Sequence, residues 1–173
     1  MAATGVGGLA PRQSRVKGGA IRMTAQDCAK YFLTKPDRDA GDDITHLKLQ
    51  KLCYYAQAWH LALFDTSLFP GRFEAWPHGP VCPDIWQAYR DRGAAPIEAP
   101  ADFDVACVSE GDRSFLNDIW DVYGRYSAKY LEEMTHQEDP WLRARGGLPP
   151  GARCNTAISE ESMRAYYAPL AQP

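Results

Sequence analysis

Residues 47–81 read LKLQKLCYYAQAWHLALFDTSLFPGRFEAWPHGPV and carry the strongest structural signal in the chain. In the first half, apolar side chains recur at the i, i+3, i+4, i+7 spacing that buries one face of a helix. They are Leu49, Leu52, Cys53, Ala56, His60 and Leu63. The second half is aromatic and contains Pro77 and Pro80, which cannot sit inside a helix. We therefore predict a long helix, a turn, and a short strand or hairpin.

A second face of the long helix is polar. Gln50, Tyr54 and Gln57 share it, because residues three or four apart are neighbours on a helix surface. We expect this face to form a contact or boundary surface.

Shorter helices are expected on both sides of this stretch. Thr24 and Asp27 have the spacing of an N-cap and its acidic partner, so a helix is predicted from residue 25 to about 34. Pro83 suits the first turn of another helix, which ends near Gly93. Residues 94–111 contain two prolines and read as a loop.

The C-terminal part has four further helical patterns. Apolar residues at helical spacing begin near residue 112, while Ser127 and Ser159 are expected N-caps. Asp139 is expected to cap a short helical turn ahead of Pro140. The fold class that follows is mainly α, a compact bundle of five to seven helices with at most a small strand or hairpin near residues 72–81.

Length and composition favour one domain preceded by an arm. The chain has 173 residues, of which 45% are hydrophobic and 24% charged, a usual balance for a globular domain. Residues 1–23 contain four basic residues, no acidic residue and no hydrophobic period, so we expect a disordered basic arm there and a single helical domain over residues 24–173. No apolar run approaches the ~20 residues that cross a bilayer.

Cysteine and charge patterns restrict the function classes. The five cysteines include no C-x-x-C pair, which favours a reducing, cytoplasmic location, with Cys28 and Cys53 as buried thiols. Residues 24–173 contain 15 basic and 22 acidic residues, a formal charge of −7. A domain with this negative charge is expected to bind nucleic acids poorly. The sequence contains no phosphate loop, nucleophile elbow or zinc-finger spacing. We therefore expect that the protein is not an enzyme and that it binds neither a metal nor a cofactor.

Two pairs of residues leave an enzymatic reading open. Cys53 and His60 lie on one helix seven residues apart, and His136 precedes Asp139 by three. A nucleophile or a general acid and base would use such residue types. The simpler interpretation is a packed helix face for the first pair and a helix end for the second.

Three motifs in order resemble the Panacea domain of SocA-like antitoxins. Residues 48–57, KLQKLCYYAQ, are similar to the family's K-L-Q-K-L-x-Y-Y-A-Q helix, and residues 74–81, EAWPHGPV, to its E-A-W-x-x-G-P-V turn. Residues 135–141, THQEDPW, resemble its later T-H-Q-E-D-P-W segment. The resemblance covers roughly residues 24–168.

The resemblance implies a bacterial or phage-borne antitoxin that binds a cognate protein toxin. Antitoxins of the SocA type act as proteolytic adaptors, so it also implies ClpX and the ClpXP protease as partners. Neutralisation by direct binding without degradation, and repression of the protein's own operon through DNA binding, remain alternatives. The motif residues that the resemblance offers as partner-binding candidates are Lys48, Gln50, Gln57, Trp76, His78, Gly79, Pro80 and His136.

Overall fold

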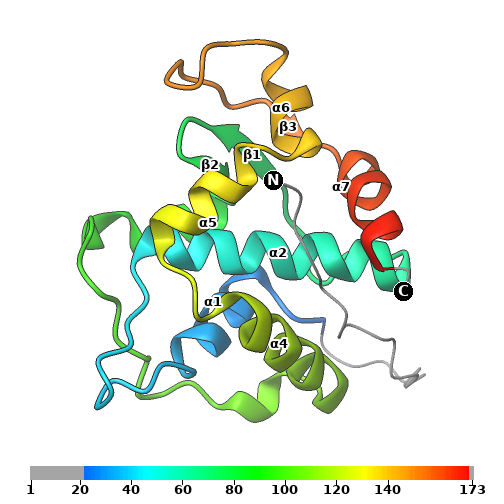
Figure 1. Cartoon of the computed structure of the whole chain (residues 1–173). Coiled ribbons are helices and arrows are strands. Elements are labelled where there is room, and N and C mark those ends of the chain that lie inside the picture. Colours follow the sequence, from blue (N-terminus) through cyan, green and yellow to red (C-terminus); the bar gives the residue numbers. More distant parts are fainter. Residues whose placement is uncertain (1–21, 172–173) are drawn as a thin grey trace.

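The computed structural model describes residues 22–171, which form seven α-helices and three short strands (Figure 1). The helices are α1 (Ala25–Leu33), α2 (His46–Phe64), α3 (Pro83–Tyr89), α4 (Glu110–Tyr123), α5 (Ala128–Thr135), α6 (Asp139–Arg145) and α7 (Glu160–Tyr167). The strands are β1 (Phe73–Trp76), β2 (Gly79–Val81) and β3 (Ala157–Ile158). Single 3-10 turns occupy Arg90–Arg92, Val105–Cys107 and Ala168–Ala171. The predicted mainly α fold is confirmed.

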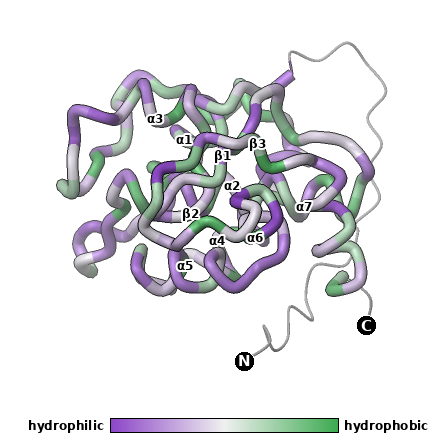
Figure 2. The backbone as a smooth tube through the Cα atoms, turned by 90° about the horizontal axis from the view of Figure 1, so that it is seen from above, coloured by the Kyte–Doolittle hydropathy of each residue, from purple (hydrophilic) through white to green (hydrophobic). Residues whose placement is uncertain are grey.

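The long helix α2 is the axis of the domain. It packs against α1, α3, α4, α5, α7 and β2, and thirteen of its nineteen residues are buried. Figure 2, seen from above, shows α3 and α7 on opposite sides of it. A helix surrounded on nearly all sides must be largely apolar all round, which is why Tyr54 and Trp59 are fully buried beside the predicted stripe.

Helix starts follow the predicted caps. The Thr24 hydroxyl accepts from the backbone N–H of Asp27, and the Asp27 carboxylate accepts from the Thr24 N–H, a reciprocal capping box. Ser127 and Ser159 likewise accept from the backbone three residues on. These bonds satisfy N–H groups that a helix start otherwise leaves without partners.

The cap predicted for α6 is wrong. The helix begins at Asp139 itself, and the preceding Glu138 occupies the N-cap position without a capping side-chain bond. The Glu138 carboxylate is buried and instead accepts hydrogen bonds from two tyrosines. A tertiary contact therefore replaces a local one.

The three strands form one antiparallel sheet in the order β2-β1-β3. Trp76 pairs with Gly79 around a two-residue turn, and Phe73 pairs with Ile158. Side chains alternate along β1, so Phe73 and Ala75 are fully buried in the core. The strand β3 was not predicted, because two residues are too short to show a period.

The expected arm is almost entirely outside the described residues, which begin at Arg22. The Arg22 guanidinium donates to the Ser67 carbonyl at 3.0 Å, and Met23 is buried in the core. Of the helices within residues 22–171, none is both long and apolar enough to cross a membrane.

Candidate functional site

The β1–β2 hairpin brings several motif residues against α5 and α2. Its turn follows Trp76, and β2 contacts both helices (Figure 1). The first residue of strand β2, Gly79, lies directly against the buried Lys51 of α2 and Thr135 of α5. These contacts fix the position of the hairpin turn on α2 and α5.

Gly79 is required at this crossing. Its φ of +93° lies in the region that side chains disfavour, and a Cβ placed there would lie 2.7 Å from both Lys51 Cε and Thr135 Oγ1. The next residue, Pro80, is buried, and its carbonyl accepts a hydrogen bond from Lys51 Nζ at 2.9 Å. Both residues therefore fix the hairpin on α2.

Lys51 is an unusual lysine, because its side chain is fully buried. Burial disfavours the ammonium form and lowers the pKa of Lys51 to about 7, although the nearby Glu132 carboxylate opposes this shift. The sequence interpretation did not single out Lys51, although it lies inside the first motif. A lysine on the buried side of an apolar helix was the available signal.

Glu132 on α5 lies beneath the turn. It accepts a hydrogen bond from His78 Nδ1 at 3.0 Å, and Lys129 Nζ lies 3.5 Å away. Burial alone would raise the pKa of Glu132, but the His78 bond and the Lys129 charge outweigh it and lower that pKa. The side chain of His78 is 78% exposed while that of Glu132 is 5% exposed, so a buried carboxylate positions an accessible imidazole.

His136 stacks on Trp141 at the end of α5, with ring centroids 4.2 Å apart. Its Nε2 is buried and lies 4.0 Å from the Glu132 carboxylate, too far for a hydrogen bond. Burial lowers the pKa of His136, which Glu132 opposes. The Trp141 indole donates to the Trp76 carbonyl at 2.9 Å, linking this ring stack to the hairpin.

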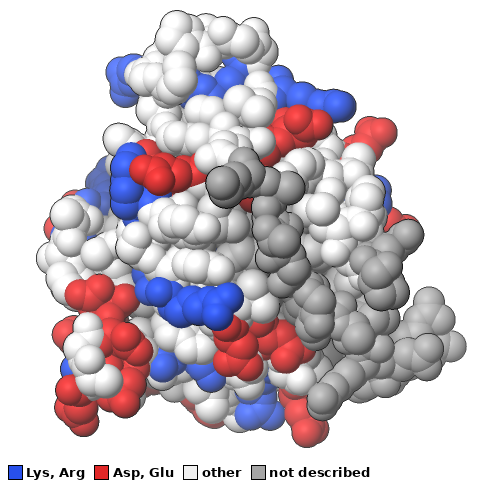
Figure 3. All heavy atoms as spheres, viewed as in Figure 1, with Lys and Arg blue, Asp and Glu red and all other residues white. Residues whose placement is uncertain are grey.

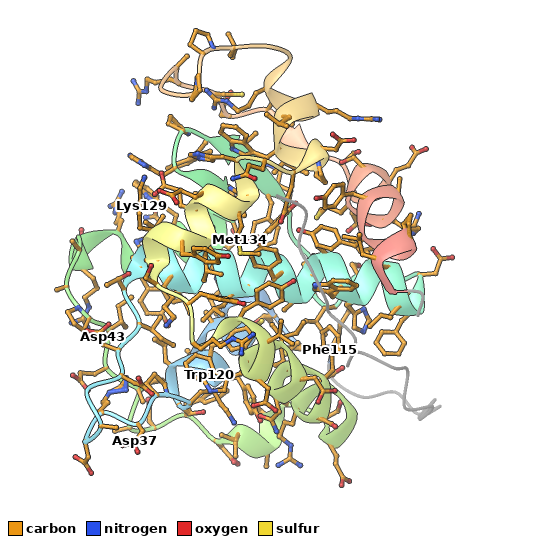
Figure 4. The ribbon with its side chains drawn as sticks, viewed as in Figure 1. Asp37, Asp43, Phe115, Trp120, Lys129 and Met134 are labelled. Carbon is orange, nitrogen blue, oxygen red and sulfur yellow. The ribbon has the colours of Figure 1, made fainter. Side chains whose placement is uncertain are left out.

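We name the group formed by Trp76, His78, Glu132 and His136 the hairpin-turn surface. Figure 4 shows α5, which contributes Glu132 and the labelled Lys129, from the same side as Figure 1. Trp76 is half-buried, and its indole donates to the Glu74 carboxylate at 2.6 Å. The surface thus combines an exposed imidazole with partly exposed aromatic rings on rigid supports.

The candidates on α2 lie elsewhere. The Gln50 amide accepts from the Cys82 N–H at 2.8 Å and donates to the Cys82 carbonyl at 3.3 Å, so it replaces a missing backbone partner where β2 ends. Gln57 does the same for the turn after α2, accepting from Leu68 N–H at 2.8 Å and donating to the Phe69 carbonyl at 3.0 Å. These two side chains and Tyr54 are buried, so of the two expectations for this face the structure shows a boundary inside the domain and not an exposed contact surface.

Lys48 lies apart from the hairpin, on the side of α4. Its ammonium donates to the Gly124 carbonyl at 2.7 Å, next to the end of α4, and lies 5.7 Å from the centre of the Trp120 ring. Cations at helix C-termini stabilise exposed carbonyls and the helix dipole. The geometry of Lys48 is that of a structural contact between α2 and α4.

Neither enzymatic pair forms a catalytic arrangement within the described residues. Cys53 is fully buried, burial raises the pKa of its thiol well above its ordinary value, and Cys28 is likewise buried as predicted. His60 Nδ1 instead bonds the Thr66 carbonyl at 2.6 Å. Asp139 pairs with Arg143 on its own helix.

Across residues 22–171 no group of three or more His, Cys, Asp or Glu side chains is placed to hold a metal ion.

Comparison with known proteins gives one match. The family model described as "Antitoxin SocA-like, Panacea domain" matches residues 49–142, more than half of the chain. This region runs from α2 into α6 and contains the whole hairpin-turn surface. No curated protein and no solved structure matches the chain.

Proposed function

The chain belongs to the SocA-like Panacea-domain antitoxin family, and from this premise we propose that it binds a cognate protein toxin and delivers it to the ClpXP protease. Family membership carries the antitoxin role, which is regulatory rather than catalytic. Toxin binding and delivery are the steps that we add.

The hairpin-turn surface is the proposed contact with the toxin. His78 offers an exposed side chain, and Trp76 offers a partly exposed one. Tryptophan is enriched among the residues that dominate binding energy at protein interfaces. Because hydrogen bonds to Glu132 and Glu74 hold the His78 ring and the Trp76 indole, little side-chain freedom is lost on binding.

Delivery requires a second region that contacts the protease. Residues 1–21 of the basic arm, which lie outside the described residues, are the proposed tether. A short flexible tether raises the local concentration of the bound toxin at the unfoldase to roughly millimolar values. Degradation then accelerates without any change in the affinity between toxin and antitoxin.

The half-life of the toxin in cells tests this proposal. It is measured with and without this protein, in strains with and without ClpX. A toxin that is short-lived only when both are present supports the adaptor. A toxin that is long-lived, harmless and bound to this protein means neutralisation by direct binding, and the delivery step is then wrong.

A role as a DNA-binding repressor receives less support. The formal charge of −7 over residues 24–173 opposes phosphate contacts, which dominate affinity for DNA. A mobility shift on promoter DNA that weakens steeply with salt would favour it.

A further inference from the structure

The loop between α6 and β3, residues 146–156, is fixed by one buried arginine. The guanidinium of Arg145, a residue only 3% exposed, donates to the carbonyls of Ala75 at 2.8 Å, Pro149 at 2.7 Å and Ala152 at 2.7 Å. It also lies over the Trp141 ring, 4.7 Å from the ring centre. With the Pro150 carbonyl, which also accepts at 3.1 Å, five groups from the strand, the loop and α6 contact this one side chain, and the loop is held against β1.

This arrangement creates a cavity of about 450 Å³ beside the sheet. One wall is formed by β1 and the hairpin turn, and the other by the end of the fixed loop. The lining residues are Glu74, Trp76, Pro77, Arg153, Cys154 and Asn155. The volume is within the range of about 300–1,000 Å³ that binds small ligands, so it accommodates one or two side chains of a partner.

The carboxylate that lines the cavity, that of Glu74, already has a partner for each oxygen. Glu74 Oε1 accepts from the Arg72 guanidinium at 2.9 Å, and Glu74 Oε2 accepts from the Trp76 indole. Both oxygens are therefore occupied, and the charge of Glu74 is balanced by that of Arg72.

Two positive charges beside the cavity are not balanced. Within residues 22–171, Arg145 donates only to carbonyl oxygens, and exposed Arg153 has no carboxylate within salt-bridge distance. Figure 3 shows Lys and Arg atoms at the top, around α6 and its loop, and a cluster of acidic atoms at the lower left. Asp37 and Asp43 are labelled there in Figure 4.

Cys154 responds to the same charges. Burial would raise the pKa of its thiol, but hydrogen bonds with Thr156 and the Arg145 guanidinium outweigh this effect and lower the pKa below its ordinary value. The Arg145 guanidinium beside the cavity thus favours a negative charge on this thiol, while the Glu74 carboxylate inside the cavity opposes it.

We propose that this cavity binds a segment of the toxin in which a carboxylate side chain stands beside an apolar one. The carboxylate of the toxin pairs with Arg153, because the planar guanidinium of an arginine offers two parallel hydrogen-bond donors to a carboxylate. The apolar side chain packs against Trp76 and Pro77. The inference rests on the proposed function, and it adds a second contact to the hairpin-turn surface, since Trp76 borders both.

The test measures the affinity of the purified full-length chain for the toxin by isothermal titration calorimetry. Arg153→Glu reverses the charge in the cavity, and Arg92→Glu makes the same change on the exposed 3-10 turn after α3. We expect Arg153→Glu to weaken binding by about tenfold or more and Arg92→Glu by less than about twofold. A Glu→Lys or Asp→Lys change in the toxin that restores binding to Arg153→Glu identifies the segment.

Other outcomes separate the claims. If the wild-type chain binds toxin and both variants bind equally well, the cavity inference is overturned while the proposed function stands. If the wild-type chain binds no toxin, both fall. If sedimentation shows a dimer of this chain that Arg153→Glu dissociates, the occupant is a second copy and the toxin segment is the wrong assignment.

Discussion

The hydroxyl of Tyr55 donates a hydrogen bond to Glu138 Oε1 at 2.9 Å inside the core. Tyr167 donates to the other oxygen of the same carboxyl group. One side chain therefore joins α2, the start of α6 and α7. Burial raises the pKa of Glu138 from 4.5 to about 7, despite both of these bonds.

This pKa predicts how stability depends on pH. Between pH 4.5 and about 7 the folded state retains a proton that the unfolded chain has released, so the free energy of unfolding falls as pH rises. Over that window the loss is roughly 3 kcal/mol. Glu138→Gln removes the titrating group, and urea unfolding of this variant at pH 5 and pH 7.5 should show a flatter profile. Exposed Glu133→Gln is the control, and equal slopes in both variants would contradict the prediction.

Lys51 predicts the opposite slope at higher pH. Its pKa falls from 10.5 to about 7 on folding, so the unfolded chain binds more protons in this window and stability rises with pH above about 7. Lys51→Met abolishes that rise, and it leaves the Pro80 carbonyl without a partner at a cost of about 1–3 kcal/mol. Unfolding at pH 7 and pH 9 measures both effects. Lys30→Met on α1 should retain the wild-type slope.

Gly79→Ala is expected to destabilise the domain. The change combines a strained φ of +93° with a Cβ 2.7 Å from Lys51 Cε, and together they cost roughly 2–4 kcal/mol. Gly147→Ala is a matched control, because its φ is +83° and nothing lies within 4 Å of the added Cβ. Thermal unfolding of both variants separates crowding from strain. An equal loss of stability in the two variants would show that the close contact of Gly79 with α2 and α5 does not contribute to the effect.

His78→Ala tests the hairpin-turn surface. The side chain is 78% exposed, but it donates to the buried Glu132 carboxylate, so its removal should lower the free energy of unfolding by about 1–3 kcal/mol and leave the domain folded. Toxin affinity should fall by about tenfold if His78 contributes to the interface as a central residue does. Lys129→Ala removes a neighbouring contact to Glu132 without touching the ring. An unchanged affinity for His78→Ala would remove this residue from the contact.

Deleting residues 1–21 tests the tether. The deletion should slow toxin degradation by ClpXP in a reconstituted reaction, because effective concentration at the unfoldase is lost. Toxin affinity should stay unchanged, since the hairpin-turn surface is intact. Degradation at the wild-type rate would exclude the arm from the delivery step.

Local features of the chain were predictable because their partners lie close in sequence. The caps at Thr24, Ser127 and Ser159 each bond a backbone N–H only three residues on. Prolines ended or began helices for equally local reasons. The motif helix of residues 48–57 also indicated the family, since its pattern lies within a single helix.

The roles of the polar motif residues depended instead on distant partners. Gln50 bonds Cys82, 32 residues away, and Tyr55 bonds Glu138, 83 residues away. A helical period assigned Gln50 and Gln57 to one face but could not show that the segments around Leu68 and Cys82 cover it. Polar side chains are stable in a core only when a backbone or side-chain group meets them there. The sequence by itself therefore determined the helix positions and indicated the family, because both depend on short-range patterns. Only the packing of the hairpin on α2 and α5 decided which motif residues are buried and left the His78 side chain exposed.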